Sequence, residues 1–383
     1  MPQSEIPKPR TEFTSVALLG SRGIPARYGG FETLVETLAT QLPKDRFRIT
    51  VFCERALRIF QPRIPGVRFI YLPVFEALRI VSEIAYDVFA LIWCTFATVR
   101  VVILFGYTAS IFCLLPRMTG RAVIINVDGL EWKREKFARP VRTILKLAEL
   151  IAPKVASEII CDSRSIQDYY RRRYSARTKY VPNPASEPAK YDPDFLKKLG
   201  VAPGSYYLVV ARLEPENHTD MIVAGFQRTK TKRKLVVVGP VMGTRFVQKL
   251  LKMSNGQVRF VGGVYNKAAL NTLRKESFAY IHGHEVGGTN PSLLESMAAG
   301  SPIIALDVPF NKEVAENAAL YFRDDKELAQ RIRWLENNPL RCRTMGTQAR
   351  AIALREYSAE KVVNGYAEAI RKAVNDESSL AHE

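Results

Sequence analysis

The segment HGHEVGGTNPSLLESMAAG, at residues 282–300, carries the strongest chemical signal in the sequence. Asn290 is a suitable N-cap and Pro291 fits the first turn of a helix, so the segment predicts a loop that leads into a short helix. Gly287 and Gly288 stand just before that helix and would let a ligand approach backbone N–H groups, where the helix dipole favours an anion. The segment predicts a phosphate or diphosphate site, and an ordinary capped helix is the alternative.

A carboxylate follows in the same predicted helix. Glu295 lies four residues after Pro291, on the same helix face and near the N-terminus. A lone carboxylate beside a phosphate site is better suited to accepting hydrogen bonds from a ribose diol than to touching phosphate. Offsetting the helix dipole is the alternative role for Glu295.

A second segment, ARLEPEN at residues 211–217, directly follows a strand expected at residues 206–210. Ligands of open α/β sheets bind at the carboxyl ends of strands. The guanidinium of Arg212 would stand at such an end, where it can bind diphosphate oxygens through two parallel hydrogen bonds. Pairing of Arg212 with Glu214 or Glu216 at the surface is the alternative.

A third segment, GSRGIPARYGGFET at residues 20–33, is a glycine-rich loop between the first expected strand and a helix. It has neither the GxGxxG spacing nor the Gly-Lys-Ser/Thr of a P-loop. Gly29 and Gly30 would offer backbone donors before the helix, and Arg22 adds positive charge. A wide turn with a purely structural role is the alternative.

A fourth segment, NVDGLEWKREK at residues 126–136, begins at the end of another expected strand. Asp128 and Glu131 occupy a strand-end position, where polar groups usually serve a site. The basic residues that follow are compatible with a solvated charged turn.

Alternating strands and helices must position these groups. In the first half, helices are predicted at residues 31–42 and 140–152, and strands at residues 16–19, 49–53, 68–72, 101–105, 122–127, 159–162 and 180–182. Four prolines between residues 182 and 193 then indicate an interdomain linker. The alternation restarts with strands predicted at residues 206–210, 235–238, 258–261, 279–282 and 303–306. This order predicts two Rossmann-like, doubly wound α/β domains that face a cleft.

Residues 88–115 form a long apolar run whose only charge is Arg100. A membrane span needs about 20 uninterrupted apolar residues, and here Arg100 and several polar residues divide the run. We predict a buried helix, a core strand at residues 101–105 and a further helix, with a shallow re-entrant segment as the alternative.

Taken together, these segments resemble the retaining family 4 glycosyltransferases of GT-B fold, and within them the bacterial polysaccharide rhamnosyltransferases. The resemblance covers nearly the whole chain and rests on five ordered motifs: GSRGIPARYGGFETLVETLA, DGLEWKREKFARPV, ICDSRSIQDYY, VARLEPEN and HGHEVGGTNPSLLESMAAG. It implies an acceptor domain at residues 1–183, a nucleotide-sugar domain at residues 184–355, and a closing helix at residues 356–383 that packs back on the first domain.

The resemblance also implies site roles. Glu295 matches the family glutamate that holds the donor ribose, whereas the position of the other family glutamate, eight residues earlier, is Gly287. This departure suggests a deoxy sugar such as rhamnose. The family lysine five residues after Arg212 is Asn217 here, so the diphosphate depends more on Arg212 and on backbone donors of Gly288, Thr289 and Asn290. His284 is expected to shape the donor pocket.

The reaction implied is sugar transfer with retention and without a metal ion or other cofactor, from a dTDP- or UDP-sugar, most simply dTDP-rhamnose. Arg212 would stabilise the leaving phosphates, and Asp128 would accept the proton of the acceptor hydroxyl. Gly29, Gly30, Arg22 and Glu131 are expected on the acceptor side. The product would belong to capsule, O-antigen or exopolysaccharide synthesis. A nucleotide-sugar epimerase and a non-catalytic nucleotide-sugar-binding subunit of an assembly complex are the alternatives.

The charge of the chain indicates the partner. The 383 residues include 56 Lys and Arg against 38 Asp and Glu, a net charge of +18, of which residues 1–185 carry +12. No nucleic-acid-binding module accompanies this charge, so we expect an anionic membrane surface rather than nucleic acid. The acceptor would then be a polyprenyl-diphosphate-linked glycan. Five scattered cysteines and a polar N-terminal segment predict a cytoplasmic protein on the inner face of the membrane.

Overall fold

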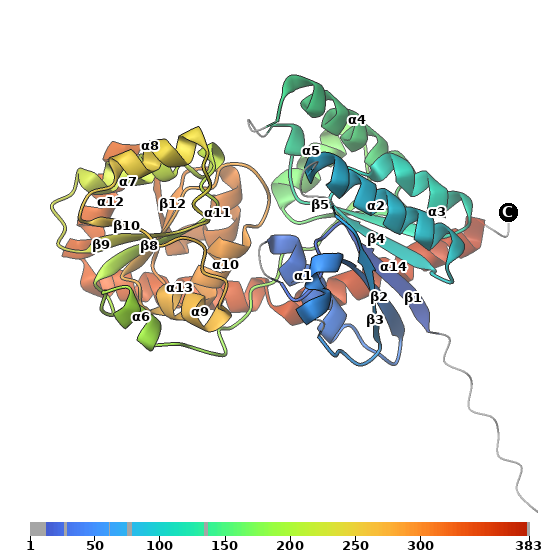
Figure 1. The fold of residues 1–383 in the computed structure, drawn as a ribbon, viewed down its shortest axis with the longest axis horizontal. Helices are drawn as coiled ribbons and strands as arrows, with labels where there is room; N and C mark the ends of the chain where they lie inside the picture. The colour runs from blue at the N-terminus through green and yellow to red at the C-terminus, as the bar shows by residue number, and fades with distance from the viewer. Residues whose placement is uncertain (1–12, 27–28, 61, 75–78, 134–136, 381–383) are drawn as a thin grey trace, which may run out of the picture. The chain divides into compact units, whose positions relative to one another are not determined.

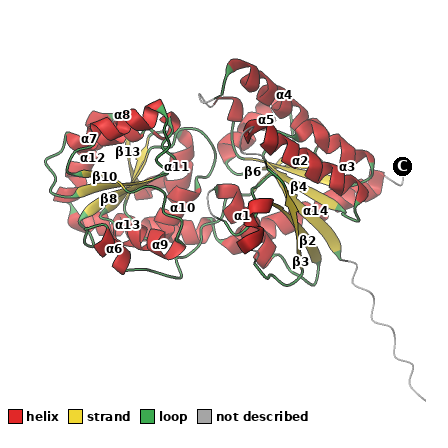
Figure 2. Cartoon of the chain, viewed as in Figure 1, coloured by secondary structure: helices red, strands yellow, loops and turns green. Residues whose placement is uncertain are grey.

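The computed structural model describes residues 13–26, 29–60, 62–74, 79–133 and 137–380 of the chain. It contains two parallel sheets with helices on both faces (Figures 1 and 2). The prediction of two Rossmann-like, doubly wound halves is therefore confirmed.

The first sheet has seven strands in the order β3-β2-β1-β4-β5-β6-β7. Its strands are β1 (Thr14–Leu19), β2 (Phe47–Glu54), β3 (Val67–Leu72), β4 (Val101–Phe105), β5 (Ala122–Val127), β6 (Glu158–Cys161) and β7 (Thr178–Tyr180). The helices between them are α1 (Gly30–Gln41), α2 (Arg79–Phe96), α3 (Leu114–Met118), α4 (Arg139–Val155) and α5 (Arg164–Tyr174). Strands β4 and β5 are buried on both faces; β4 is entirely apolar and β5 is apolar except for Asn126, as is typical of central parallel strands.

The second sheet has six strands in the order β10-β9-β8-β11-β12-β13. Its strands are β8 (Tyr206–Val210), β9 (Lys234–Val238), β10 (Val258–Phe260), β11 (Ala279–His282), β12 (Ile303–Leu306) and β13 (Ala319–Phe322). The helices are α6 (Asp194–Lys198), α7 (Thr219–Gln227), α8 (Arg245–Met253), α9 (Lys267–Glu276), α10 (Pro291–Ala298), α11 (Pro309–Ala315), α12 (Asp325–Asn337) and α13 (Pro339–Glu356). The chain reverses its strand order beside β8, where ligands of such sheets bind.

Most strands lie where the sequence predicts them, within one or two residues. The strand expected at residues 180–182 instead ends at Tyr180, because Pro182 and Pro184 follow and proline cannot donate to a sheet. Strand β13 was not predicted, since it has four residues and two of them are only partly buried.

The described chain divides into two compact units. One comprises the described residues of Met1–Asn126, Ala148–Ile159 and Gly365–Glu383, and the other comprises those of Val127–Leu147 and Ile160–Asn364. The domain boundaries expected at residues 183 and 355 stay predictions.

The closing segment forms helix α14 (Ala359–Leu380) after a break that separates it from α13. Tyr366 and Ile370 are fully buried, which fits the amphipathic spacing seen in the sequence. The Asn126 amide donates to the Tyr366 hydroxyl, and Glu377 pairs with Arg117. Helix α14 therefore completes the core of the unit that contains β1 to β5.

The long apolar run at residues 88–115 folds into the end of α2, strand β4 and a 3-10 turn (Ser110–Cys113) before α3. No described helix is long and apolar enough to cross a bilayer. The expectation of a buried helix is right for one face of α2 and wrong for the other, where Phe89 and Phe96 are 57% and 84% exposed. Among the α2 side chains that the structure describes, Leu91 and Cys94 on the opposite face are buried.

Candidate functional site

The loops that follow β8 and β11 meet at one edge of the second sheet. These strands are parallel neighbours, so their carboxyl ends lie at the same edge. The Glu285 N–H donates to the Glu216 carbonyl at 3.0 Å, and the His284 Nδ1 atom lies 2.8 Å from the Asn217 Oδ1 atom. The structure thus brings together the two segments from which the sequence predicts a diphosphate site.

Arg212 lies at the end of β8 with a side chain that is 35% exposed. Its guanidinium pairs with Glu214 at 3.6 Å, which is the alternative that the sequence left open. The Asn217 amide donates to the Arg212 carbonyl at 2.9 Å, so Asn217 holds the loop backbone, and its predicted contact with the donor stays a prediction. An anion can compete for Arg212, because the pair with Glu214 is long and partly solvated.

Helix α10 begins as the sequence predicts. The Asn290 side chain accepts a hydrogen bond from the Ser292 N–H at 2.9 Å, and Pro291 is the first helical residue. Gly300 has a φ of +79° just beyond the helix, where glycine is favoured. The N-terminus of α10 therefore has the cap and backbone geometry on which an anion site depends.

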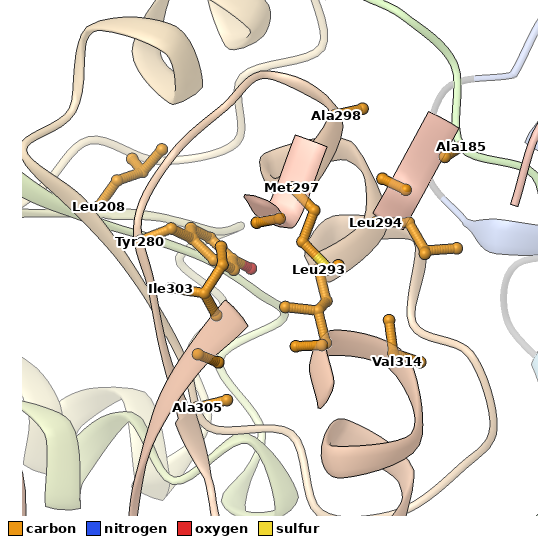
Figure 3. Packing of buried hydrophobic residues seen from close by; sticks show 14 of the residues in the cluster. Ala185, Leu208, Tyr280, Leu293, Leu294, Met297, Ala298, Ile303, Ala305 and Val314 are labelled. Atoms are coloured by element: carbon orange, nitrogen blue, oxygen red, sulfur yellow. The ribbon is translucent and has the colours of Figure 1, made fainter. Parts of the chain in front are cut away.

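The inner face of α10 fixes its rotation on the sheet. Figure 3 shows Leu293 and Met297 against Tyr280 of β11 and Ile303 of β12, and all four side chains are fully buried. Glu295 lies between the buried positions and stays 28% exposed. The apolar core thus fixes the rotation of α10 and with it the position of this carboxylate.

Glu295 is not the lone carboxylate that the sequence suggested. Its side chain pairs with the guanidinium of Arg274 on α9, a side chain that is only 3% exposed. The Nη2 atom of Arg274 makes this ion pair, whereas its Nε atom has no hydrogen-bond partner among the described residues. Arg274 can therefore hold Glu295 in a fixed orientation before any ligand arrives.

Gly288 has a reason inside the protein to be glycine. A Cβ atom at this position would overlap the carboxylate of Asp162, which follows β6 and is almost fully buried. From the sequence, the glycine pair was explained by the approach of a ligand. At Gly288 the Asp162 carboxylate already leaves no room for a side chain. Gly287 has a φ of +138°, which also favours glycine.

The Asp162 carboxyl belongs to a buried polar cluster. It accepts hydrogen bonds from the Asn183 amide at 3.3 Å and from the Thr289 hydroxyl at 3.4 Å. Burial, and then the negative charge of Asp128, raise the pKa of Asp162 well above its usual range. Asn183 also donates to the Thr289 carbonyl at 2.8 Å, so the cluster fixes the loop just before α10.

Asp128 and Glu131 lie after β5. The Asp128 carbonyl would stand 3.7 Å from a Cβ atom at Gly287, so this strand end lies beside the glycine-rich loop. Asp128 is partly exposed, and Glu131 begins a 3-10 turn (Glu131–Lys133). The structure therefore brings the backbone of Asp128 to the predicted donor loop. Residues 134–136 of the same basic segment lie outside the described residues.

Gly29, Gly30 and Arg22 belong to the other compact unit. Gly29 is the N-cap of α1, and the side chain of Glu32 folds back over it. The sequence predicted an open set of backbone donors, but a carboxylate of the chain itself lies at this helix end. Arg22 pairs with Glu54 at 3.6 Å.

The histidines differ in environment. Burial lowers the pKa of His282 to about 3, so its ring is neutral at physiological pH. His218 pairs with Glu285 at 2.8 Å. Glu285 lies two residues before Gly287, the position at which the resemblance leads one to expect a glutamate. Among the residues the structure describes, no group of three or more His, Cys, Asp and Glu side chains could hold a metal ion.

Three contributors to this site were not predicted: Asp162, Asn183 and Arg274. Asp162 closes a buried strand, so the strand-end argument used for Asp128 would have found it. Asn183 lies in the proline-rich linker, and Arg274 lies on a helix 21 residues before its partner. No local spacing marks either of them.

The comparisons with known proteins begin with the fold. The chain is similar to sucrose-phosphate synthase from Thermosynechococcus elongatus, with 16% identity, a TM-score of 0.76 and coverage of 94% of this chain and 98% of that one. It is also similar to HepE from Anabaena in complex with UDP-glucose, with 17% identity, a TM-score of 0.74 and coverage of 94% and 100%. A glycosyltransferase from Rickettsia africae aligns with 11% identity and a TM-score of 0.68 over 95% and 99% of the two chains. The fold is that of the GT-B glycosyltransferases.

The family matches then divide the chain. Residues 194–352 match the family Glycosyl transferases group 1. Residues 13–185 match a domain of unknown function, DUF1972. No curated protein matches the chain.

Proposed function

We propose that the protein is a retaining glycosyltransferase that moves a sugar from a nucleotide sugar to a polyprenyl-diphosphate-linked glycan. The match of residues 194–352 to the glycosyl transferases group 1 supports the reaction class. The structures of HepE with UDP and with UDP-glucose support a nucleotide-sugar donor, since that protein shares the fold.

One observation carries the proposal. Arg212, the capped N-terminus of α10 and Glu295 all belong to the glycosyltransferase domain, and the loops after β8 and β11 are joined by hydrogen bonds. A guanidinium and a helix N-terminus bind a diphosphate, whereas a carboxylate held by a buried arginine accepts hydrogen bonds from ribose hydroxyls. These groups match two parts of a nucleoside diphosphate sugar, its diphosphate and its ribose.

The chemistry follows from the same groups. The bond between the anomeric carbon and the diphosphate oxygen breaks, and the acceptor hydroxyl oxygen bonds to that carbon on the same face. Arg212 and the N–H groups of residues 288–290 stabilise the charge on the departing diphosphate without a metal ion. Asp128 accepts the proton of the acceptor hydroxyl.

The sugar is proposed to be rhamnose, supplied as dTDP-rhamnose. Gly287 leaves no side chain where relatives of this class place a glutamate, and Glu285 pairs with His218 instead. A sugar with fewer hydroxyl groups needs fewer acceptors there. The acceptor would lie on the inner face of the membrane, to which the net charge of +12 in residues 1–185 attracts the protein.

The first test is a thermal-shift screen of nucleotide sugars, followed by transfer of labelled sugar to a lipid extract. A ligand that binds the native state raises its stability. Labelled lipid supports the proposal, whereas an isomerised donor without transfer would show an epimerase. Tight binding without turnover would show a non-catalytic subunit.

The second test is Arg212→Ala, with Arg323→Ala as the control. Arg323 is an exposed arginine paired with Glu327, so its loss removes the same charge from another surface. Loss of a charged hydrogen bond costs about 1.5–3 kcal/mol, which predicts roughly 10- to 100-fold weaker nucleotide binding for Arg212→Ala alone. Equal affinities for the two variants would refute the site.

A further inference from the structure

Exposed apolar side chains gather on α2, the 3-10 turn Ser110–Cys113 and α3. Eight large side chains in this stretch are exposed: Phe89, Ile92, Phe96, Ile111, Phe112, Leu114, Leu115 and Met118. Helices α2 and α3 pack against each other, so these residues lie on adjoining elements of one compact unit. We call these eight residues the α2–α3 surface.

The row on α2 has a regular spacing. Phe89, Ile92 and Phe96 are separated by three and four residues, which places them on one face of the helix. The opposite face buries Ala90, Leu91 and Cys94 completely, so the helix already has its contact with the core. The exposed row is therefore a second apolar face, beyond what folding of this unit needs.

The degree of exposure is large. Phe96 is 84% exposed and Met118 is 82% exposed. Soluble monomeric proteins scatter single apolar residues over their surface, and they rarely group several large ones without a binding role. Another surface is therefore expected to cover this group.

The charges around the surface select the kind of partner. Residues 88–127 contain Arg100, Arg117 and Arg121 and no Asp or Glu. Arg100 is exposed beside the end of α2, whereas Arg117 pairs with Glu377 of α14. The acidic residues of α2, Glu83 and Asp87, precede the exposed row, so the stretch that carries the surface, residues 88–118, has only positive charge. Such an apolar stretch complements the headgroups and acyl chains of an anionic bilayer.

We propose that the α2–α3 surface docks on an anionic lipid bilayer and inserts its aromatic and aliphatic side chains into the interface. Because its exposed row runs along one face, helix α2 would lie in the plane of the membrane. The proposal deepens the membrane association in the proposed function by naming the surface and adding apolar insertion to the charge. It does not depend on sugar transfer.

The test is flotation with vesicles of neutral lipid alone or with one quarter anionic lipid, without donor or acceptor. The variant carries Phe89→Ser, Phe96→Ser and Met118→Gln. The control carries Ile59→Gln and Leu340→Gln, which are 80% and 77% exposed elsewhere. We expect at least tenfold weaker binding to anionic vesicles for the variant and unchanged binding for the control. Unfolding temperature and nucleotide binding should stay the same in all three proteins.

Salt separates apolar insertion from charge alone. At high salt the wild-type protein should keep part of its vesicle binding, because apolar burial is not screened. The proposal would be overturned if the variant bound anionic vesicles as well as the wild type and if high salt abolished binding of both. Such a result would indicate that another, purely electrostatic face binds the membrane. A wild-type dimer that the variant converts to a monomer, with no vesicle binding by either, would identify the surface as a contact between two copies. Failure of nucleotide binding or sugar transfer would leave the vesicle result unaffected.

Discussion

Removal of Glu295 should destabilise the protein more than removal of its partner Arg274. The two side chains are 28% and 3% exposed, respectively. Glu295→Ala leaves a buried guanidinium whose Nε atom already has no hydrogen-bond partner among the described residues. Arg274→Met keeps a long apolar side chain and leaves a carboxylate that can reach water.

The magnitudes follow from this difference in burial. Breaking a buried ion pair by removing one partner costs about 3–5 kcal/mol, and partial solvation of this pair reduces the figure to roughly 2–3 kcal/mol for Glu295→Ala. For Arg274→Met we expect about 1 kcal/mol. Urea unfolding of the two variants and of the double variant gives the free energies of unfolding. If Arg274→Met costs as much as Glu295→Ala, the argument from burial is wrong.

Ligand binding distinguishes a ribose contact from a merely structural ion pair. At a temperature where all variants are folded, Glu295→Ala should bind UDP roughly 10- to 100-fold more weakly, from the loss of about 1.5–3 kcal/mol in charged hydrogen bonds. Its affinity for inorganic diphosphate, which Arg212 would hold, should not change. Calorimetric titration with both ligands measures this difference. An equal loss for the two ligands would contradict the proposed role in binding ribose.

Three further changes test the interior of the compact unit that contains Glu295. His282, with a folded pKa of about 3 against about 6.5 in the unfolded chain, stabilises the fold above pH 6.5, and this contribution falls as the pH drops. Urea unfolding at several pH values between 6 and 4 gives the free energy of unfolding as a function of pH. This free energy should change less steeply with pH in His282→Leu, by about 1.4 kcal/mol per pH unit, and an equal pH dependence in both proteins would contradict the assignment. The pKa of Asp162 is raised, so its effect on stability depends on pH in the opposite way. Asp162 stabilises the fold most below about pH 4, and this stabilisation declines as the pH rises. Asp162→Asn should thus gain stability relative to the wild type between pH 5 and pH 8, and a constant difference would refute this. Gly288→Ala should cost about 1–3 kcal/mol because of the overlap with Asp162, whereas Gly243→Ala, with open space around it, should have little effect in the same unfolding assay.

The strands could be predicted because central parallel strands are buried on both faces and therefore appear as apolar runs. Strands β4, β5, β8, β11 and β12 have the predicted bounds. Strand β13 was missed because a short, half-buried strand has no such run. The prediction that α2 is buried was wrong for one of its faces. The second half of this helix is apolar on nearly all sides, so the sequence alone does not distinguish its buried face from its exposed one.

The site could be predicted in part. Residues near a strand end or a helix start, such as Arg212 and Asn290, share a local pattern that the sequence displays. The side chains that contact these residues come from elsewhere in the chain. Arg274 of α9 pairs with Glu295 of α10, and the carboxylate of Asp162, which follows β6, lies against Gly288. Such contacts depend on how the elements pack, so no spacing in the sequence indicates them.

The position of α14 has a consequence for the order in which the chain can fold during synthesis. Tyr366 and Ile370 fill the core beside strands whose residues are made more than two hundred positions earlier, and the Asn126 amide has its recorded partner in Tyr366. The unit that is translated first cannot bury this core until residues 366–377 have left the ribosome. Its apolar surfaces therefore stay exposed to chaperones for most of translation. The second sheet needs no residue after β13, so all of its strands have been synthesised before α14 is made.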